Sequence, residues 1–363
     1  MSRFVVKIGT SSLTDEAGVI DTEVIDKVAA EVTALRTAGH EVTIVSSGAI
    51  SAGLPVLGIA ASDRPTDSVA LQALSSIGQP ALLRSWSTSL DQHGVAIGQI
   101  LLAPHNFGER AQYLHARSTL SKLHELGVVP LINENDAVTD AEIRFGDNDR
   151  IAALVAHLVS ADVLVLLTDT DGILTADPRV DPNASLIEEV AEFDQLVDSV
   201  IGGPGTVRGS GGMVSKLTAA RIAAWSGVRT VIANAARPNV ITDAALGVEG
   251  VGTTINARPV TLSARKLWIG FAMPALATVV VDGGARRALE QGGKSLLSVG
   301  VMSIDGTFER RDPVEIVDRD GVVFAKGITR SSSDDLGGEG SVLDHTSEPA
   351  AIVVHVDDLV VLG

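Results

Sequence analysis

The chain has 363 residues, a length that exceeds one typical domain and predicts two. Apolar residues make up 45% of it and aromatic residues only 3%, which favours an aliphatic core of parallel strands covered by helices. The net charge of −17 argues against broad binding to a nucleic-acid backbone, and the lack of cysteine excludes disulfides, thiolate metal sites and cysteine nucleophiles.

The first predicted unit is strand, helix, strand. An apolar strand at residues 4–8 begins almost at the N-terminus, which leaves no room for a signal peptide. A helix follows from about residue 22, with Asp21 as its N-cap and Gly39 near its end. The next strand, 41–45, ends in Ser46-Ser47-Gly48-Ala49. No apolar run reaches the roughly 20 residues of a membrane span, so we expect a cytoplasmic protein.

The alternation of helices and strands continues to about residue 260 and predicts an open, mostly parallel α/β sheet sandwiched by helices. The later elements of this part are two helices at 68–77 and 80–90, a strand at 95–102, a helix at 114–126, a strand at 128–132, a helix opening near 151, a strand at 163–167, a helix at 216–224 and a strand at 230–233.

Beyond residue 268 the pattern changes to short β-like runs separated by Gly, Asp and Ser turns. These runs lie at 278–281, 314–317, 322–324 and 351–354, with one helical patch at 285–290. We therefore predict a domain at 1–260, a linker at 261–274 and a small β-rich domain at 275–363.

Two polar clusters flank one loop in the middle of the chain. Asn133-Glu134-Asn135-Asp136 follows the strand at 128–132, and Gly146-Asp147-Asn148-Asp149 precedes a helix. Amides and carboxylates at the carboxyl end of a strand and the amino end of a helix suit a small polar substrate. The alternative is that they are ordinary caps and turns.

Three further segments suggest a phosphate site. Lys7 lies before Gly9-Thr10, where backbone amides and hydroxyls can cradle phosphate oxygens, although an edge lysine is the alternative. The glycine-rich run 209–216 enters a helix that carries Lys216, which suits a polyphosphate, although it can also be a loop with an incidental lysine. Thr168-Asp169 ends another strand at the same expected edge. Histidines show no metal-ligand spacing, and Mg²⁺ that arrives with a nucleotide leaves little trace in a sequence.

Taken together, these motifs resemble the amino acid kinase superfamily, and within it the branch of glutamate 5-kinases. The similar segments are VVKIGTSSL (5–13), VSSGAI (45–50), INENDAV (132–138), GDND (146–149), LLTDTDGILTADPR (166–179) and GSGGMVSK (209–216). The C-terminal part resembles a PUA domain, so the resemblance covers nearly the whole chain.

The resemblance implies roles for individual residues. Lys7 and Lys216 are expected to contact the transferring phosphoryl group, and Asp149 is expected to orient Lys7, Lys216 or both. The residues expected to bind the amino acid are Ser47, Gly48, Ala49, Asn133, Asp136, Asp147 and Asn148. Those expected to line the ATP site are Lys7, Gly9, Thr10, Thr168, Asp169, Ser210, Gly211, Gly212, Met213, Val214, Ser215 and Lys216.

The implied reaction is the phosphorylation of the γ-carboxylate of L-glutamate by ATP with Mg²⁺, the first step of proline biosynthesis. The resemblance also implies feedback inhibition by proline through the loop between the polar clusters, a homo-oligomer (dimer or tetramer), and a reductase partner that consumes glutamyl phosphate. A carboxylate with a pKa of about 4.3 is already an anion at neutral pH, so its attack needs no general base.

Two alternatives stay open. The first is a related kinase that acts on a different carboxylate or a phosphorylated acceptor. The second is an RNA-binding regulator that acts through the PUA-like domain. Residues 275–363 hold 8 Lys and Arg against 15 Asp and Glu, a net charge of −7, which lacks the basic footprint of nucleic-acid binding.

Overall fold

The computed structural model describes residues 1–15, 17–107, 110–138, 147–176, 181, 183–190, 211–259, 261–273, 275–337 and 351–362. Contacts divide the chain into two units, each described by itself below. The first comprises Met1–Asn106 and Ala111–Thr261, and the second comprises Phe107–Arg110 and Leu262–Gly363. No helix among the described residues combines the length and the apolar character that a membrane span requires.

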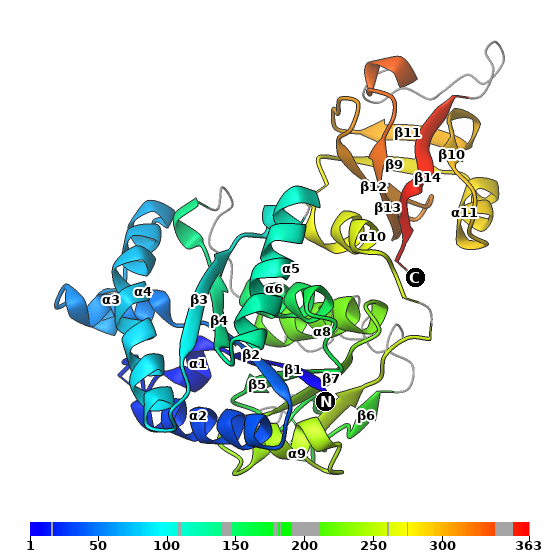
Figure 1. Ribbon diagram of the computed structural model, residues 1–363. Coiled ribbons are helices and arrows are strands. Elements are labelled where there is room, and N and C mark those ends of the chain that lie inside the picture. Colours follow the sequence, from blue (N-terminus) through cyan, green and yellow to red (C-terminus); the bar gives the residue numbers. More distant parts are fainter. Residues whose placement is uncertain are drawn as a thin grey trace. The chain divides into compact units, whose positions relative to one another are not determined.

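The first unit is built on an eight-stranded sheet in the order β3-β4-β2-β1-β5-β7-β8-β6 (Figure 1). In this order, all neighbouring strands from β3 to β7 are parallel. β8 is antiparallel to β7, and β6 is parallel to β8, so these two strands run opposite to the others. Its strands are β1 (Arg3–Ile8), β2 (Glu41–Ser46), β3 (Ile97–Leu102), β4 (Val129–Glu134), β5 (Val163–Thr168), β6 (Glu189–Val190), β7 (Arg229–Asn234) and β8 (Gly252–Ile255). The predicted mostly parallel α/β sheet is confirmed.

Helices cover both faces of this sheet, and each face has its own side chains because residues alternate along a strand. Phe4, Val6 and Ile8 of β1 join the core under α2, α4 and α9, so Lys7 points to the opposite face, under α6 and α8. The helices are α1 (Thr10–Leu13), α2 (Thr22–Thr37), α3 (Ala49–Val56), α4 (Ser68–Asp91), α5 (Arg110–Glu125), α6 (Asp147–Leu158), α8 (Gly211–Trp225) and α9 (Val240–Leu246), with short turns η1 (Ala61–Asp63), η2 (Pro104–Phe107) and η3 (Asp136–Val138).

The prediction of two helices at 68–77 and 80–90 was wrong, because α4 runs unbroken through Pro80. A proline inside a helix removes one hydrogen bond and costs about 3 kcal/mol. Burial of Leu82 and Trp86, which are at most 1% exposed, offsets that cost by holding the second half of the helix in the core. The helix predicted at 216–224 also begins earlier, at Gly211.

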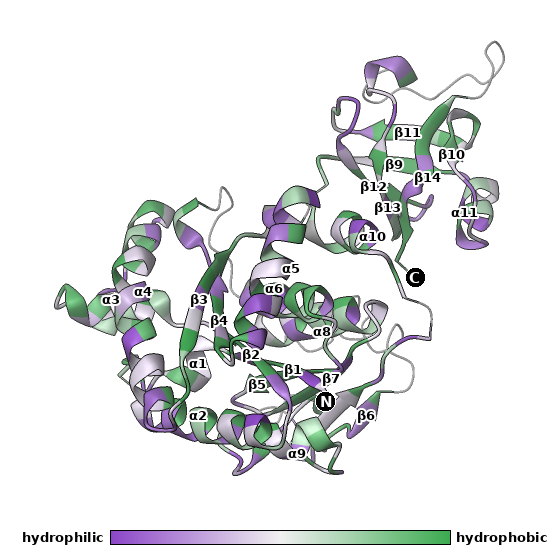
Figure 2. Cartoon of the chain, in the orientation of Figure 1, coloured by the Kyte–Doolittle hydropathy of each residue, from purple (hydrophilic) through white to green (hydrophobic). Residues whose placement is uncertain are grey.

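The second unit holds a six-stranded sheet in the order β10-β14-β13-β12-β9-β11, which confirms the predicted small β-rich domain. Its apolar strand residues are green in Figure 2 and form a core with Phe308 and Leu336. The elements are β9 (Ala277–Val281), β10 (Leu296–Leu297), β11 (Val301–Asp305), β12 (Pro313–Val317), β13 (Val323–Thr329), β14 (Ile352–Val361), α11 (Gly283–Glu290), η5 (Ser298–Gly300) and η6 (Asp334–Leu336).

Two short helices precede β9 and pack within this second unit. They are α10 (Ala264–Leu267) and η4 (Trp268–Ala272), in the segment that the sequence analysis assigned to a linker. Ile269 is 1% exposed and packs with Ile328 of β13 and Val360 of β14, while Arg265 donates to Asp358 at 2.6 Å. This apolar cluster binds the segment to the sheet.

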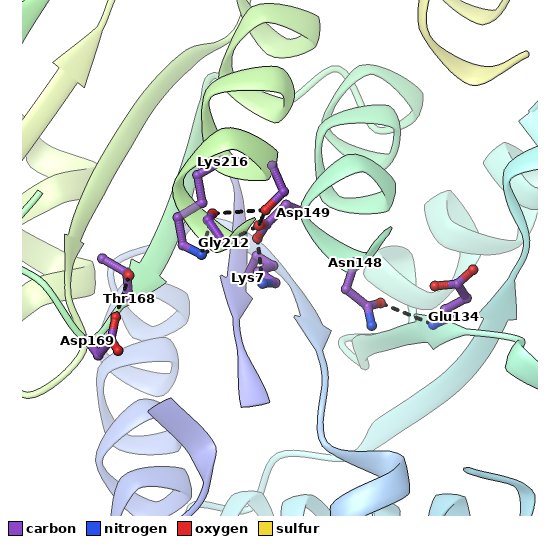
Figure 3. A network of polar contacts seen from close by, with 9 residues as sticks. Lys7, Glu134, Asn148, Asp149, Thr168, Asp169, Gly212 and Lys216 are labelled. Atoms are coloured by element: carbon purple, nitrogen blue, oxygen red, sulfur yellow. Dashed lines mark hydrogen bonds and ion pairs between the residues drawn. The ribbon is translucent and has the colours of Figure 1, made fainter. Parts of the chain in front are cut away.

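The carboxyl ends of the parallel strands meet at one edge of the first sheet, as their shared direction requires. Backbone bonds join the loops there: Ser47 N donates to Ile8 O at 3.1 Å, and Ala235 N donates to Thr168 O at 2.7 Å. In such open sheets this edge is the usual place for a ligand. The amino ends of α6 and α8 lie at the same edge (Figure 3).

Candidate active site

A buried trio of charges occupies this edge (Figure 3). Lys7 of β1, Asp149 of α6 and Lys216 of α8 converge, although they are far apart in the sequence. Asp149 Oδ1 lies 2.5 Å from Lys7 Nζ, and its Oδ2 lies 3.5 Å from Lys216 Nζ. The three side chains are 4%, 1% and 8% exposed, respectively. Two ammonium groups therefore share one carboxylate, and all three groups are largely shielded from bulk water.

The protonation of the trio follows from burial and mutual charge. Burial alone would raise the pKa of Asp149, but the charges of Lys7 and Lys216 hold that pKa below its ordinary value. Burial lowers the pKa of Lys7, the Asp149 charge opposes this, and the Lys216 charge adds to it. Because the trio combines two lysines with one carboxylate, it has a net charge of +1 when all three groups are ionised, and it can then accommodate an additional anion.

The start of α8 supplies the third member of the trio and two further polar contacts. The Lys216 side chain turns back along the helix, as side chains tilt towards the amino end, and Nζ donates to Gly212 O at 3.3 Å. The Ser215 hydroxyl lies 2.6 Å from Asp149 Oδ2 and 2.9 Å from Gly212 O. Unpaired amides at a helix start attract anions, so this end suits phosphate groups.

The predicted residues after β1 lie beside this trio. A side-chain carbon added at Gly9 would be 3.3 Å from Lys7 Nζ, so the glycine lies directly against the ammonium group. Thr10 opens α1, which follows at once. The chain therefore passes close to the lysine without a side chain that would cover it.

On the other side, the turn after β2 leads into α3. Ser47 is joined to the end of β1 by its backbone N–H, and Gly48 has a φ of 97°, a conformation that L side chains rarely adopt. Ala49 then opens α3. These three predicted residues form the border of the site along β1 and β2.

The two polar clusters contact each other in the structure. The Glu134 backbone N–H is shared between Asn133 Oδ1 at 2.8 Å and Asn148 Oδ1 at 3.2 Å. This bond joins the end of β4 to the start of α6. Asn133 is 3% exposed, and its Nδ2 has no hydrogen-bond partner among the described residues. A buried donor without a partner is costly, so this amide is well placed to donate to a ligand.

Asp136, in η3, has a protein partner that the sequence did not reveal. Its Oδ2 accepts a hydrogen bond of 2.5 Å from the Ser75 hydroxyl of α4. Burial raises the pKa of Asp136 above its ordinary value, and the bond from Ser75 partly opposes this shift. Nothing in the sequence distinguishes Ser75 from the other serines of a long helix.

The loop after β5 forms the opposite end of the site. The Thr168 hydroxyl donates to Asp169 Oδ1 at 3.1 Å, and Asp171 accepts a bond of 2.9 Å from Asn234 at the end of β7. Thr168 is buried, whereas Asp169 is exposed. This end lies on the α8 side of Lys7, and the Asn148–Glu134 contact lies on the other (Figure 3).

Several predicted residues have no described side-chain position. Ser210 and the loop at 139–146 lie outside the described residues, and Asp147 and Gly211 are placed only as the first residues of α6 and α8. Met213 and Val214 lie in the first turn of α8 and are partly exposed.

The carboxylates of the site do not form a metal centre by themselves. Both oxygens of Asp149 already contact lysine or serine, and no group of three potential metal-binding side chains occurs among the described residues. A magnesium ion there would depend on phosphate oxygens and water for its ligands.

Comparisons with known proteins identify the family of the chain. The model of the amino acid kinase family matches residues 2–234, and that of the PUA domain matches residues 277–338. The chain is 42% identical to the glutamate 5-kinase of Janthinobacterium sp. (strain Marseille), over 99% of this chain and 98% of that protein. The glutamate 5-kinase of Burkholderia mallei (strain SAVP1) has the same identity and the same coverage.

Among solved structures, an isopentenyl phosphate kinase is similar with a TM-score of 0.51 and 22% identity. The match covers 70% of this chain and 100% of that one. At this identity the similarity supports the fold alone.

Proposed function

Because the chain belongs to the amino acid kinase family, and within it to the glutamate 5-kinases, we propose that Lys7, Asp149 and Lys216 form its phosphoryl-transfer centre. The family membership gives the reaction: ATP phosphorylates L-glutamate in proline biosynthesis. A γ-carboxylate oxygen attacks the γ-phosphorus of ATP, the bond from that phosphorus to the bridging oxygen breaks, and ADP leaves with the electron pair.

The observation that carries the proposed roles is the pairing of two buried lysines with a single carboxylate. The attacking group and the transferring phosphoryl group are both anions at neutral pH, so their repulsion must be screened. Two ammonium groups that share one carboxylate supply this screening, and the buried setting strengthens it. Asp149 keeps both lysines in place and does not need to accept a proton.

We assign the donor and the acceptor to opposite sides of Lys7. The start of α8, with Gly212 and Ser215, and the loop of Thr168-Asp169 take the phosphates and the rest of ATP. The residues that take glutamate are Ser47, Gly48, Ala49, Asn133, Asp136, Asp147 and Asn148. In this arrangement the Asp136 carboxylate binds the α-ammonium group of glutamate. Mg²⁺ is proposed to enter with ATP, bound to phosphate oxygens and water.

Trapping of the product tests the activity. The purified chain is incubated with ATP, Mg²⁺ and hydroxylamine, with and without L-glutamate, and the hydroxamate of the acyl phosphate is measured. Hydroxamate that depends on L-glutamate supports the proposal. If hydroxamate stays at background with L-glutamate but forms with another carboxylate such as L-aspartate, that carboxylate and not glutamate is the substrate.

A phosphorylated acceptor is the second candidate within this enzyme class. It would call for arginines at the acceptor side, whereas the contacts there come from Asp136 and the amides of Asn133 and Asn148. A carboxylate suits an ammonium-bearing amino acid and repels a phosphate. The acidic second domain likewise gives no support to RNA binding, and a filter-binding assay at low salt would contradict this if it gave nanomolar affinity.

Asp136→Ala should raise the KM for glutamate roughly 10- to 100-fold, since it removes a charged partner of the substrate, while kcat and the KM for ATP change little. Initial rates at varied glutamate and at varied ATP give both constants. Asp91→Ala, at the exposed end of α4, is the control and should leave them unchanged. An unchanged glutamate KM in Asp136→Ala would place the amino group elsewhere.

Feedback inhibition by proline is proposed to act through residues 138–145, most of which lie outside the described residues. Val138→Ala should raise the proline concentration for half-inhibition roughly tenfold with activity retained, since an inhibitor loses its coupling when its contacts are lost. Val56→Ala is a matched control because Val138 and Val56 are 56% and 57% exposed. Unchanged inhibition by proline in Val138→Ala and in alanine variants of the remaining loop residues would move the sensor elsewhere.

The remaining proposals concern the surroundings of the enzyme. We propose a cytoplasmic homo-oligomer, a dimer or a tetramer, that delivers its product to a glutamyl-phosphate reductase. The support is chemical, because an acyl phosphate hydrolyses readily and benefits from a nearby enzyme that consumes it.

A further inference from the structure

The hydrogen bond between Ser75 and Asp136 joins α4, which has no assigned part in the reaction, to η3, which carries a proposed substrate-binding residue. Ser75 lies in the middle of α4 and is 2% exposed, and its hydroxyl is 2.5 Å from Asp136 Oδ2. This side-chain contact links α4 to Asp136 of the proposed acceptor site.

The helix that carries Ser75 is fixed against the other border of the same site. A side-chain carbon on Gly78 would lie 1.8 Å from Ala49 O, and one on Gly53 would lie 2.2 Å from Leu74 O. Backbones of α3 and α4 therefore touch directly, and no side chain larger than hydrogen fits between them. Since Ala49 opens α3, Ser75 cannot shift without moving the turn at Ser47 and Gly48.

A carboxylate that binds an ammonium group has to be ionised and correctly aimed. Burial raises the pKa of Asp136, and the Ser75 hydroxyl opposes this by stabilising the ionised form. Among the described residues no charge offsets the burial: α3 and residues 68–83 of α4 contain no ionisable side chain, and Glu134, an acid at the end of β4, is the nearest in sequence. Of the groups that the structure describes, the hydroxyl is therefore the main one that favours the carboxylate before substrate binds.

We propose that Ser75 is a positioning residue for the acceptor: it aims Asp136 at the α-ammonium group of glutamate and ties this contact to the turn at residues 47–49. The proposal rests on the proposed function, which gives Asp136 its substrate. Through α4, Asp136 and the turn at residues 47–49, which both take the amino acid in the proposed function, keep one fixed spacing, which favours an acceptor of one length.

Ser75→Ala tests the role through a change that simple loss of stability does not produce. We expect the KM for glutamate to rise about tenfold, since a hydrogen bond to a charged group is lost, with kcat and the KM for ATP nearly unchanged. The acidic limb of the kcat/KM profile for glutamate should move to higher pH, because the pKa of Asp136 rises without its donor. Ser75→Cys, whose thiol is a weaker donor, should give intermediate values.

Ser89→Ala is the matched control. Ser89 also lies on α4, is 3% exposed and donates to a carboxylate, that of Asp26, away from the site. Ser89→Ala should lose about as much folding stability as Ser75→Ala, and it should keep the wild-type KM for glutamate and the wild-type pH profile. If wild type forms glutamate-dependent hydroxamate while Ser75→Ala keeps its glutamate KM and acidic limb, or if Ser89→Ala shifts them equally, the positioning role is wrong. Absence of glutamate-dependent hydroxamate in wild type would instead contradict the proposed function.

Discussion

Lys216→Ala should lower kcat about 10²- to 10³-fold, while the KM for glutamate changes several-fold at most. The Lys216 ammonium lies 3.5 Å from Asp149 and close to the start of α8, where the proposed mechanism has negative charge build up as the phosphoryl group transfers. An interaction that strengthens in the transition state contributes more to kcat than it contributes to substrate binding. Initial-rate measurements at saturating ATP and varied glutamate separate the two effects.

Folding should survive this substitution, because Asp149 keeps its contact with Lys7 at 2.5 Å. Thermal unfolding of the variant checks this point. Lys122→Ala removes a lysine that is 66% exposed and pairs with Glu125, so it should change neither constant. A loss in Lys216→Ala that arises through KM alone would assign Lys216 to binding rather than to the transition state.

Asp149→Asn should abolish most activity and also lower the free energy of unfolding by about 3–5 kcal/mol, the usual effect of removing one partner of a buried ion pair. Two buried ammonium groups, Lys7 and Lys216, would remain without their shared carboxylate. Denaturant unfolding near neutral pH measures the difference. Glu125→Gln breaks an exposed pair and should cost less than about 1 kcal/mol.

The pH dependence of unfolding provides a second check on Asp149→Asn. In wild type the pKa of Asp149 lies below its ordinary value of 3.8, so its stabilising contribution is complete above that pH and disappears as the pH falls through the folded-state pKa. The variant lacks this component, so its destabilisation relative to wild type should shrink in acid. An equal difference at pH 7 and at pH 2 would mean that the carboxylate charge does not stabilise the fold.

The sequence predicted the fold well because its signals were local. Apolar runs alternating with helical patterns gave the parallel sheet, and the polar clusters at strand ends gave the edge where the charged trio lies. The departure of β8 and β6 from the parallel direction has no such signal, so their reversal was not predicted. The continuity of α4 through Pro80 was not predicted either, since burial of Leu82 and Trp86 cannot be judged from local sequence.

The site was less accessible to sequence reasoning than the fold. Lysines at positions 7 and 216 could be selected by their glycine-rich surroundings, and the family resemblance gave Asp149 a role beside them. That both lysines pair with one carboxylate could not be predicted from local sequence, because the three groups lie on different elements that only the fold brings together. Ser75 had no signal at all, because a serine inside an apolar helix looks the same whether it faces a carboxylate or the helix backbone.

The packing of η4 against β13 and β14 determines where the chain can be cut. A fragment that began at residue 275 would lose Ile269 and Trp268 and would expose the apolar surfaces of Ile328 and Val360 to water. A fragment from Leu262 onwards keeps these partners together with the Arg265–Asp358 contact. A cut that separates the two units should therefore be made before Leu262, so that the C-terminal fragment keeps the apolar cluster around Ile269.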